Sequence, residues 1–278
     1  MNLLFILFIL VAVSILVYKL FWKSSRKQLF TGNSKPIGSK QTSTNKFSPN
    51  TKTQKVSFEF DESKTGIGKY LIFDLETTGL PQGSRSIIET IDKWPRIIQI
   101  AWVILDEELL LVKKENFFIK IPEKIPVSVS KINGITNAKL EEFGRSPNTV
   151  FGSFINDLKV CDVLISHNLD FDAKVLEVDL LRNNFPFQLQ KKKMICTMLS
   201  GKNYFFSQPL MQSKYPKLTE LFGKLYFNRI DISIDEAHDA FADTLIAAKC
   251  FIKLFEIDKQ GVKILKNYRL NSDFYQIG

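Results

Sequence analysis

The sequence has few residues that could hold a soft metal ion or build a disulfide framework. Its 278 residues include only three cysteines and two histidines. The cysteines, Cys161, Cys196 and Cys250, form no CxxC pair and are odd in number, so neither a structural zinc site nor a set of disulfides is expected. We expect buried, reduced thiols, which are typical of a reducing compartment.

Acidic residues are absent from the first fifth of the chain. Residues 1–56 contain nine of the 38 lysines and arginines and no aspartate or glutamate, which leaves 38 − 9 = 29 basic against 29 acidic residues in the rest. The formal charge of +9 and the pI near 9.3 therefore originate in the N-terminal segment. Because the remainder is neutral overall, its net charge gives no argument for a basic nucleic-acid-binding domain.

A long apolar run occupies the N-terminal 22 residues. As a helix it would extend about 33 Å, enough for a hydrocarbon core of about 30 Å. We expect a transmembrane anchor over residues 1–22, in contact with membrane lipid. The basic residues that follow it predict a single-pass protein with its globular part in the cytoplasm. One alternative is a cleaved signal peptide, but the run has no basic n-region and no A-x-A-like site. The other is an apolar segment that does not span the membrane.

The segment after the anchor is rich in Ser, Thr, Asn and Lys and poor in large apolar groups. Such a composition cannot offset the entropy of ordering, so residues 23–57 are predicted to form a basic, flexible linker. The linker could bind anionic headgroups or nucleic acid, or could serve only as a soluble tether.

The rest of the chain, residues 58–278, is predicted to be one α/β domain. Apolar runs predict strands over residues 69–74, 96–105, 109–121 and 162–166, and helical periodicity predicts helices over 128–133, 147–160, 171–182, 217–227 and 238–257. A further helix is expected directly after Thr136, which could cap it. Three successive strands followed by alternating elements indicate a mixed sheet flanked by helices.

Four carboxylates and one histidine lie at the edges of these elements. They are Asp74, Glu76, Asp172, His238 and Asp243. The period of two along a strand puts Asp74 and Glu76 on one face, where their charges repel unless a cation lies between them. Carboxylate oxygens suit Mg²⁺ or Mn²⁺, and a histidine can take a proton from an attacking water near neutral pH.

Less specific interpretations remain open for each of these residues. Asp74 and Glu76 could be exposed acids in a turn, Asp172 could be only a helix cap, and His238 could contact only solvent. Spacing alone also leaves Asp170 and Asp239 as alternatives to their neighbours.

Three segments of the sequence resemble the motifs of the DnaQ-like DEDDh 3′–5′ exonucleases. They are Phe73–Leu80, His167–Asp172 and His238–Asp243, which occur in order at separations similar to the family's. The family includes the bacterial replicative proofreading subunit, ribonuclease T and oligoribonuclease. Residues 97–100 and 132–136 also look like the family, and the resemblance covers about residues 68–257. Asn133 departs from it, because many members have histidine at that position.

The resemblance implies a ribonuclease H-like fold, two Mg²⁺ or Mn²⁺ ions, and release of 5′-mononucleotides. By resemblance, Asp74, Glu76, Asp172 and Asp243 hold the metals and His238 is the general base. Thr77, Leu80, Asn168 and Phe171 would line the terminal nucleotide.

Expected partners follow from the same resemblance. They are 3′ ends of single-stranded DNA or RNA, a separate polymerase or other repair or degradation partner, and a second copy of the chain, since some relatives dimerise. Two other functions remain open at this stage. One is a non-catalytic nucleic-acid-binding module of the same fold, and the other is a membrane-tethering scaffold.

Overall fold

The computed structural model describes residues 58–82, 91–185, 189–207, 214–232 and 239–270. The predicted anchor at residues 1–22, the predicted linker at 23–57 and His238 lie outside these ranges. Within the described ranges, no helix combines the length and apolarity needed to cross a membrane.

The described strands form one six-stranded mixed sheet in the order β3-β2-β1-β4-β5-β6. Their bounds are β1 Tyr70–Thr77, β2 Ile97–Leu105, β3 Leu111–Phe118, β4 Val163–Ser166, β5 Lys193–Cys196 and β6 Asn267–Tyr268. β1, β2 and β3 pair antiparallel, β4 and β5 continue parallel to β1, and β6 pairs antiparallel with β5. The predicted mixed α/β architecture is confirmed, although the sequence patterns did not reveal β5 or β6.

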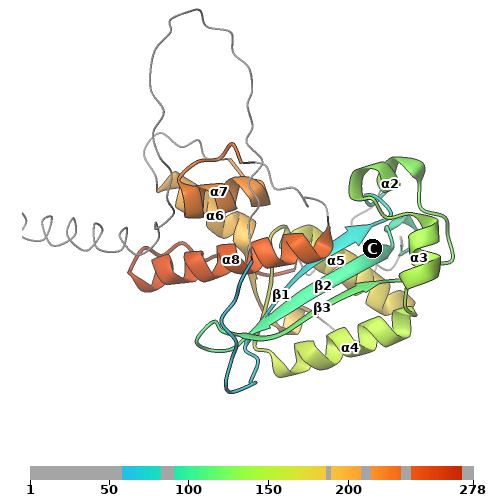
Figure 1. Ribbon diagram of the computed structural model, residues 1–278, viewed down its shortest axis with the longest axis horizontal. Helices are drawn as coiled ribbons and strands as arrows, with labels where there is room; N and C mark the ends of the chain where they lie inside the picture. The colour runs from blue at the N-terminus through green and yellow to red at the C-terminus, as the bar shows by residue number, and fades with distance from the viewer. Residues whose placement is uncertain (1–57, 83–90, 186–188, 208–213, 233–238, 271–278) are drawn as a thin grey trace, which may run out of the picture. The chain divides into compact units, whose positions relative to one another are not determined.

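Helices cover both faces of this sheet (Figure 1). Their bounds are α2 Val127–Asn133, α3 Asn137–Phe143, α4 Pro147–Val160, α5 Leu169–Arg182, α6 Thr197–Phe206, α7 Leu218–Phe227 and α8 Ala240–Lys259, and short 3₁₀ turns span Ile91–Lys93 and Leu189–Lys191. The predicted helices are present, and α6 is an addition to them. Figure 1 shows α4 on one side of the strands and α8 crossing the other.

Alternation along β1 separates the two hydrophobic cores. Leu71, Phe73 and Leu75 point into the core beneath α4 and α5, where Phe73 packs edge-on against Phe154 at 5.8 Å between ring centroids. Tyr70 and Ile72 point to the opposite core, beneath α8. A slip of one residue in β1 would exchange the two sets and turn Asp74 and Glu76 into the apolar core beneath α4 and α5, so the register is firmly specified.

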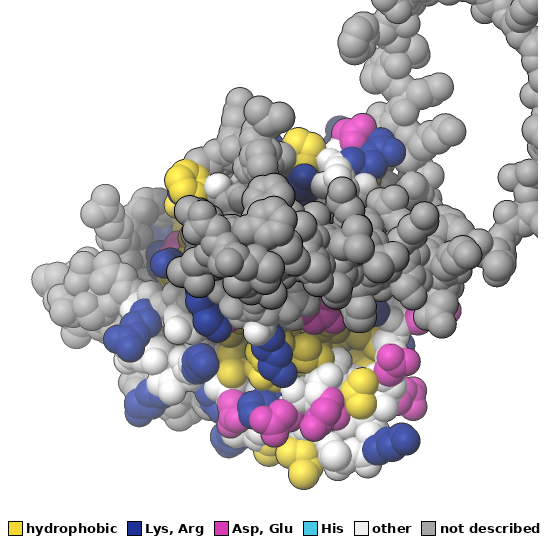
Figure 2. Space-filling model, turned by 90° about the vertical axis from the view of Figure 1, so that its left-hand side faces the viewer, with side chains coloured by type: hydrophobic (Ala, Val, Ile, Leu, Met, Phe, Trp, Pro, Cys, Tyr) yellow, Lys and Arg dark blue, Asp and Glu magenta, His cyan; other side chains and the backbone are white. Residues whose placement is uncertain are grey.

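Charge on the domain surface is mixed. Figure 2 shows the side that is on the left in Figure 1, where basic, acidic and hydrophobic side chains are interspersed among the described residues. This agrees with the balance of 29 basic and 29 acidic residues beyond residue 56. Any surface suited to nucleic acid must therefore be identified from local groups and not from net charge.

Candidate active site

The candidate site is built on the face of β1 that α8 covers. Asp74 and Glu76 continue the alternation of Tyr70 and Ile72, so their side chains project towards α8. Asp243, in the first turn of α8, meets them there, and one carboxylate oxygen from each of the three residues lies within 4.8 Å of the other two. The prediction that Asp74 and Glu76 share a face is confirmed.

Asp172 approaches the same cluster from the other side of the sheet. It lies in the first turn of α5, is 4% exposed, and accepts a hydrogen bond from the hydroxyl of Ser166 at the end of β4. Its charge is the largest electrostatic contribution that neighbouring residues make to the raised pKa of Asp74. The parallel pairing of β1 with β4 therefore brings all four predicted carboxylates to one edge of the sheet.

Burial and mutual repulsion make the ionised cluster costly. Burial raises the pKa of Asp74 well above its usual value, and the charges of Asp172, Asp243 and Glu76 raise it further. Burial raises the pKa of Glu76 to about 7, against the opposing effect of a hydrogen bond from Asn133. Burial likewise raises the pKa of Asp172 to about 7, opposed by hydrogen bonds from Ser166 and the backbone. In the absence of a cation, these groups favour protonation near neutral pH.

The donor set fits a hard divalent cation. All four groups are carboxylates, they converge from three elements, and their oxygens are the ligands that Mg²⁺ and Mn²⁺ prefer. A bound cation would replace the protons that the crowded carboxylates otherwise need. An accidental group of exposed acids would not need a cation in this way, because exposed carboxylates stay ionised without a partner.

The two neighbouring aspartates that spacing left open have other partners. Asp239 caps α8, accepting hydrogen bonds from the backbone N–H groups of Phe241 and Ala242 at 3.0 and 3.1 Å. Asp170 is exposed and pairs with Lys174, and it also accepts a hydrogen bond from Tyr268. Helix capping and surface pairing therefore account for both.

The predicted substrate residues follow β1 or lie at the start of α5, close in the chain to the carboxylates. Leu80 is 75% exposed, while the buried Thr77 donates its hydroxyl to the carbonyl of Gly79 at 2.7 Å and shapes the turn after β1. Asn168 is exposed at the start of α5, and Phe171 packs partly against the core beneath it. His238, the predicted base, lies outside the described residues, directly before Asp239.

Gln99 lies within residues 97–100, which resemble the family, but the motif analysis assigned it no role. It is fully buried on β2, directly opposite Glu76 in the antiparallel register. Its amide donates to Asp239 and to Asn116, each at 3.0 Å, and its carbonyl oxygen accepts from the N–H of Ala240 at 3.4 Å. Gln99 therefore holds the start of α8 against the strand that pairs with β1. A polar residue inside an otherwise apolar strand was the available signal.

Asn133 also has a role that sequence comparison obscured. Its side-chain amide donates to Glu76 at 3.3 Å, and its own oxygen accepts from the N–H of Ile135 at 3.1 Å. The residue that departs from the family pattern thus connects the end of α2 to the carboxylate cluster. Since an amide donor favours the ionised form of Glu76, it partly offsets burial.

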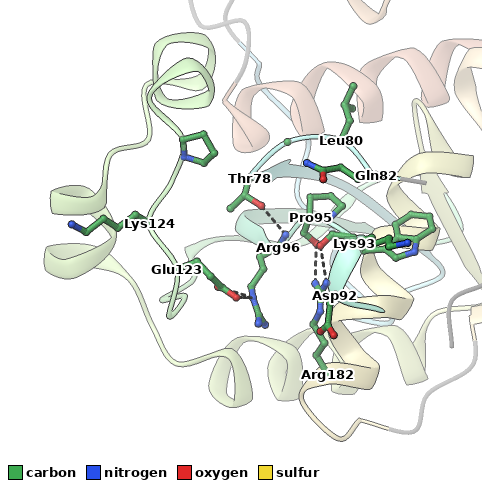
Figure 3. A pocket seen from close by; sticks show the side chains of 13 residues that line it. Thr78, Leu80, Gln82, Asp92, Lys93, Pro95, Arg96, Glu123, Lys124 and Arg182 are labelled. Atoms are coloured by element: carbon green, nitrogen blue, oxygen red, sulfur yellow. Dashed lines mark hydrogen bonds and ion pairs between the residues drawn. The ribbon is translucent and has the colours of Figure 1, made fainter. Parts of the chain in front are cut away.

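A pocket of about 360 Å³ opens beside the turn that follows β1 (Figure 3). Thr78 and Leu80 line it from the turn, and the backbone N–H of Arg96 donates to the hydroxyl of Thr78 at 2.9 Å. The guanidinium of Arg96 pairs with Glu123, 2.7 Å away, while Lys93 also lines the pocket. A partly basic, polar pocket next to the carboxylates suits a phosphate-bearing ligand.

Arg182 fixes one wall of this pocket. It donates to the backbone carbonyls of Pro95 and Trp94 at 2.9 and 2.7 Å, and it pairs with the buried Asp179 at 2.6 Å. Asp179 in turn accepts from the N–H of Ile97 at 2.7 Å. Because these groups satisfy one another away from water, the segment before β2 is held rigidly against α5.

A comparison with protein families decides the class of the site. The family model of the RNase_T exonucleases, described as exonuclease, matches residues 71–251, which include all five predicted motif residues. The chain belongs to the RNase_T exonuclease family. The predicted DnaQ-like DEDDh 3′–5′ exonuclease domain, a phosphodiester hydrolase, is thereby confirmed, and this family normally uses divalent metal ions.

Relatives of this exonuclease domain occur within much longer proteins. The chain is 27% identical over 205 residues to a PolC-type DNA polymerase III from Mycoplasmopsis pulmonis, covering 73% of the chain and 12% of the polymerase. The PolC-type polymerase of Mycoplasma pneumoniae is 29% identical over 125 residues, or 45% of the chain and 8% of the polymerase. The chain thus spans only a small part of the curated relatives it matches.

Solved nucleases share the fold of the exonuclease domain. The nuclease domain of 3′hExo, a DEDDh family member bound to rAMP, superimposes with a TM-score of 0.51 at 16% identity, covering 73% of this chain and 96% of that one. Escherichia coli exonuclease I in complex with a dA16 oligonucleotide gives a TM-score of 0.51 at 18% identity, covering 69% of this chain and 42% of that one.

Replacing Asp74 by Asn should stabilise the metal-free protein and remove its stabilisation by Mn²⁺. The substitution eliminates a charge that four acidic neighbours repel, so at pH 8 in EDTA we expect a gain of about 1 kcal/mol in the free energy of unfolding, or roughly 2–4 °C in the thermal midpoint. Thermal denaturation with EDTA and with Mn²⁺ measures both effects. The exposed control, Asp170→Asn, should show neither, and retention of the Mn²⁺ effect in the Asp74 variant would contradict the ligand assignment.

The pKa values also fix the sign of the pH dependence for the wild-type protein in EDTA. Glu76 and Asp172 have folded pKa values of about 7, above those of the unfolded chain. The folded state therefore holds protons that the unfolded chain releases, and this contribution to stability is lost as pH rises from about 4 to 7. The gain from Asp74→Asn should accordingly shrink at pH 5.

Replacing Gln99 by Leu should loosen the start of α8. It leaves Asp239 and Asn116 without their buried amide donor, which costs about 1–3 kcal/mol. It should also raise the Mn²⁺ concentration needed for half-maximal thermal stabilisation, because Asp243 is positioned by the same helical turn. The matched control is Asn116→Ala, which removes a bond to the same amide but leaves those to α8. Equal Mn²⁺ requirements in the two variants would argue against a positioning role.

Proposed function

We propose that this chain is a membrane-anchored 3′–5′ exonuclease that hydrolyses the terminal phosphodiester bond of single-stranded DNA or RNA and releases 5′-mononucleotides. The observation that carries the proposal is the convergence of carboxylate oxygens from Asp74, Glu76 and Asp243 within 4.8 Å, with the buried Asp172 beside them. This arrangement is unfavourable for stability alone and becomes useful when cations and a phosphate occupy it.

In this proposal the four carboxylates would hold two Mg²⁺ or Mn²⁺ ions, with Asp74 contributing to both. When bound, the ions would supply Lewis-acid stabilisation of the charge that develops on the reacting phosphate. His238 would take a proton from the attacking water. The water oxygen then bonds to phosphorus as the bond from phosphorus to the 3′-oxygen of the penultimate nucleotide breaks, and a proton restores that 3′-hydroxyl.

The terminal nucleotide would lie across the turn that follows β1. Leu80 offers an exposed apolar surface for the base, and the adjacent pocket of about 360 Å³ supplies Lys93 and Arg96 near its phosphate or sugar. Asn168 and Phe171, at the start of α5, would border the nucleotide on the other side. Holding the nucleotide in the reactive orientation in this way would supply much of the rate enhancement, because the protein forms no covalent bond to the substrate.

The substrate sugar and the physiological partner are left open by this site. The curated relatives are named as DNA polymerases, which favours DNA and a polymerase or repair enzyme as a separate partner. However, discrimination between sugars depends on contacts to the 2′-hydroxyl. The first assay therefore uses both DNA and RNA oligonucleotides. A homodimer is a further proposal that sedimentation of the purified protein would test.

The proposed membrane anchor is supported by the apolar run of residues 1–22 and the nine basic residues before residue 57. In this arrangement the linker of residues 23–57 would hold the exonuclease domain near the cytoplasmic surface of the membrane.

The nuclease assay uses the full chain in mild detergent with 5′-labelled DNA and RNA oligonucleotides of the same sequence. With Mg²⁺ or Mn²⁺ we expect stepwise shortening from the 3′ end, and none in EDTA. His238→Ala should reduce kcat by about 10²- to 10⁴-fold while leaving oligonucleotide binding intact, because it removes only the proton acceptor. Binding without cleavage by the wild-type protein would instead identify a non-catalytic nucleic-acid-binding module.

The anchor is tested by deletion of residues 1–22. The full chain should sediment with membranes in high salt, whereas the truncated chain should move to the soluble fraction, since about 4–8 kcal/mol of insertion free energy is removed. Replacing the five basic residues nearest the anchor by Gln is the control for purely electrostatic attachment. Continued sedimentation of the truncated chain would overturn the proposal.

A further inference from the structure

The segment before α7 is held beside the end of β4. His167 is buried directly after β4, and its Nε2 donates to the carbonyl of Pro216 at 3.0 Å. Its Nδ1 lies 3.0 Å from the hydroxyl of Thr197, so each ring nitrogen of the neutral imidazole has a hydrogen-bond partner. Burial lowers the pKa of His167 to about 4, so this bonding pattern persists across the neutral range.

Close packing between α6 and this segment fixes it further. Pro216 is buried, and a Cβ atom added to Gly201 would lie only 3.0 Å from its ring and 2.9 Å from the side chain of Leu221. Because proline also restricts the residue before it to extended conformations, the backbone of Tyr215 has little freedom. The ring of Tyr215 is therefore presented from a rigid support.

Tyr215 is an exposed aromatic side chain next to an amine. It is 54% exposed, and the Nζ of Lys202 lies 4.1 Å from its ring centroid. An aromatic ring with a cation beside it is the combination that single-stranded nucleic acids bind, by stacking of the base and neutralisation of the phosphate.

The charge of the chain segment around Tyr215 is positive, as the binding of a nucleic acid requires. Residues 197–228 contain four lysines and one glutamate, a net charge of 4 − 1 = +3, in a domain whose total charge is balanced. Lys214 pairs with Glu220 at 2.8 Å, and Lys217 is exposed at the start of α7. This short stretch therefore concentrates basic groups that net charge did not reveal.

The position of the ring relates it to the candidate active site. His167, which holds Pro216, is followed at once by Asn168 and then by the first turn of α5, which carries Asp172. Tyr215 thus adjoins, through Pro216 and His167, the end of β4 from which α5 carries Asp172 into the carboxylate cluster. A strand whose terminal phosphate lies at those carboxylates would reach the ring with its preceding nucleotides.

We propose that Tyr215, Lys202 and Lys217 form a stacking platform for single-stranded nucleic acid on the 5′ side of the terminal nucleotide. This inference rests on the proposed function. Tyr215 would stack on a base, while the two lysines would contact phosphates. The platform would favour longer strands over the shortest substrates, because only longer strands extend beyond the terminal nucleotide.

The test compares a 20-nucleotide single strand with the p-nitrophenyl ester of thymidine 5′-monophosphate, which is too short to reach the platform. For the full chain, Tyr215→Ser should raise KM for the 20-mer about tenfold or more, and leave kcat and the parameters for the ester unchanged. Tyr215→Phe retains the ring and should behave as wild type. Equal changes for both substrates, or no change for either, would overturn the platform.

A matched control comes from the other end of α7. Phe227 is 41% exposed and is separated from Pro216 by the length of the helix, about 15 Å. Phe227→Ser should leave KM for both substrates unchanged. An effect equal to that of Tyr215→Ser would show that the loss comes from a general change in α7.

A binding measurement separates this proposal from the proposed catalytic function. Fluorescence anisotropy with a labelled 20-mer in EDTA requires no cleavage. Tyr215→Ser should weaken binding about tenfold or more, and Lys217→Gln should reduce the slope of log affinity against log salt by about 0.7. If the wild-type protein binds but cleaves neither substrate, the catalytic proposal fails, and weaker binding by Tyr215→Ser would still support the platform. Unchanged binding in both variants rejects the platform.

Discussion

Crowding of carboxylates at one edge of the sheet is the constraint on which the rest of the site depends. Asp74 and Glu76 can share a face only because β1 keeps strict alternation, and this places them on the side covered by α8. Asp172 reaches the cluster because β4 runs parallel to β1 and ends beside it. Burial then gives each charge a high cost that a cation can offset.

The docking of α8 converts this crowding into a defined geometry. Gln99 holds Asp239 and the N–H of Ala240, and the buried hydroxyl of Thr244 bonds to the carbonyl of Ala101 at 3.2 Å. These contacts tie the first turns of α8 to β2, directly beside the strand that carries Asp74. Asp243, the candidate metal ligand on α8, is therefore positioned by polar contacts between the start of that helix and β2. The motif His238–Asp243 gives no indication of these contacts.

The match to the exonuclease family and the carboxylate cluster occupy the same part of the chain. The matched region, residues 71–251, begins within β1 and ends within α8, so it includes every strand and helix that contributes a carboxylate. The solved relatives cover most of the domain at 16–18% identity. At such low identity, the pattern of buried residues and the pairing of strands are sufficient to keep the fold. Surface loops, such as the one that carries Tyr215, are free to differ.

Local periodicity was sufficient to predict the strands β1 and β2 and the helix α8, because it is written along the chain. Resemblance to the family motifs identified the candidate carboxylates. Periodicity also predicted that Asp74 and Glu76 share a face. Spacing without the family resemblance could not choose between Asp172 and Asp170. The sequence also did not show the roles of Gln99 and Asn133, since those depend on partners up to 140 residues away. The short strand β5 escaped detection because burial between neighbouring strands specifies it, and this is a property that only the tertiary structure supplies.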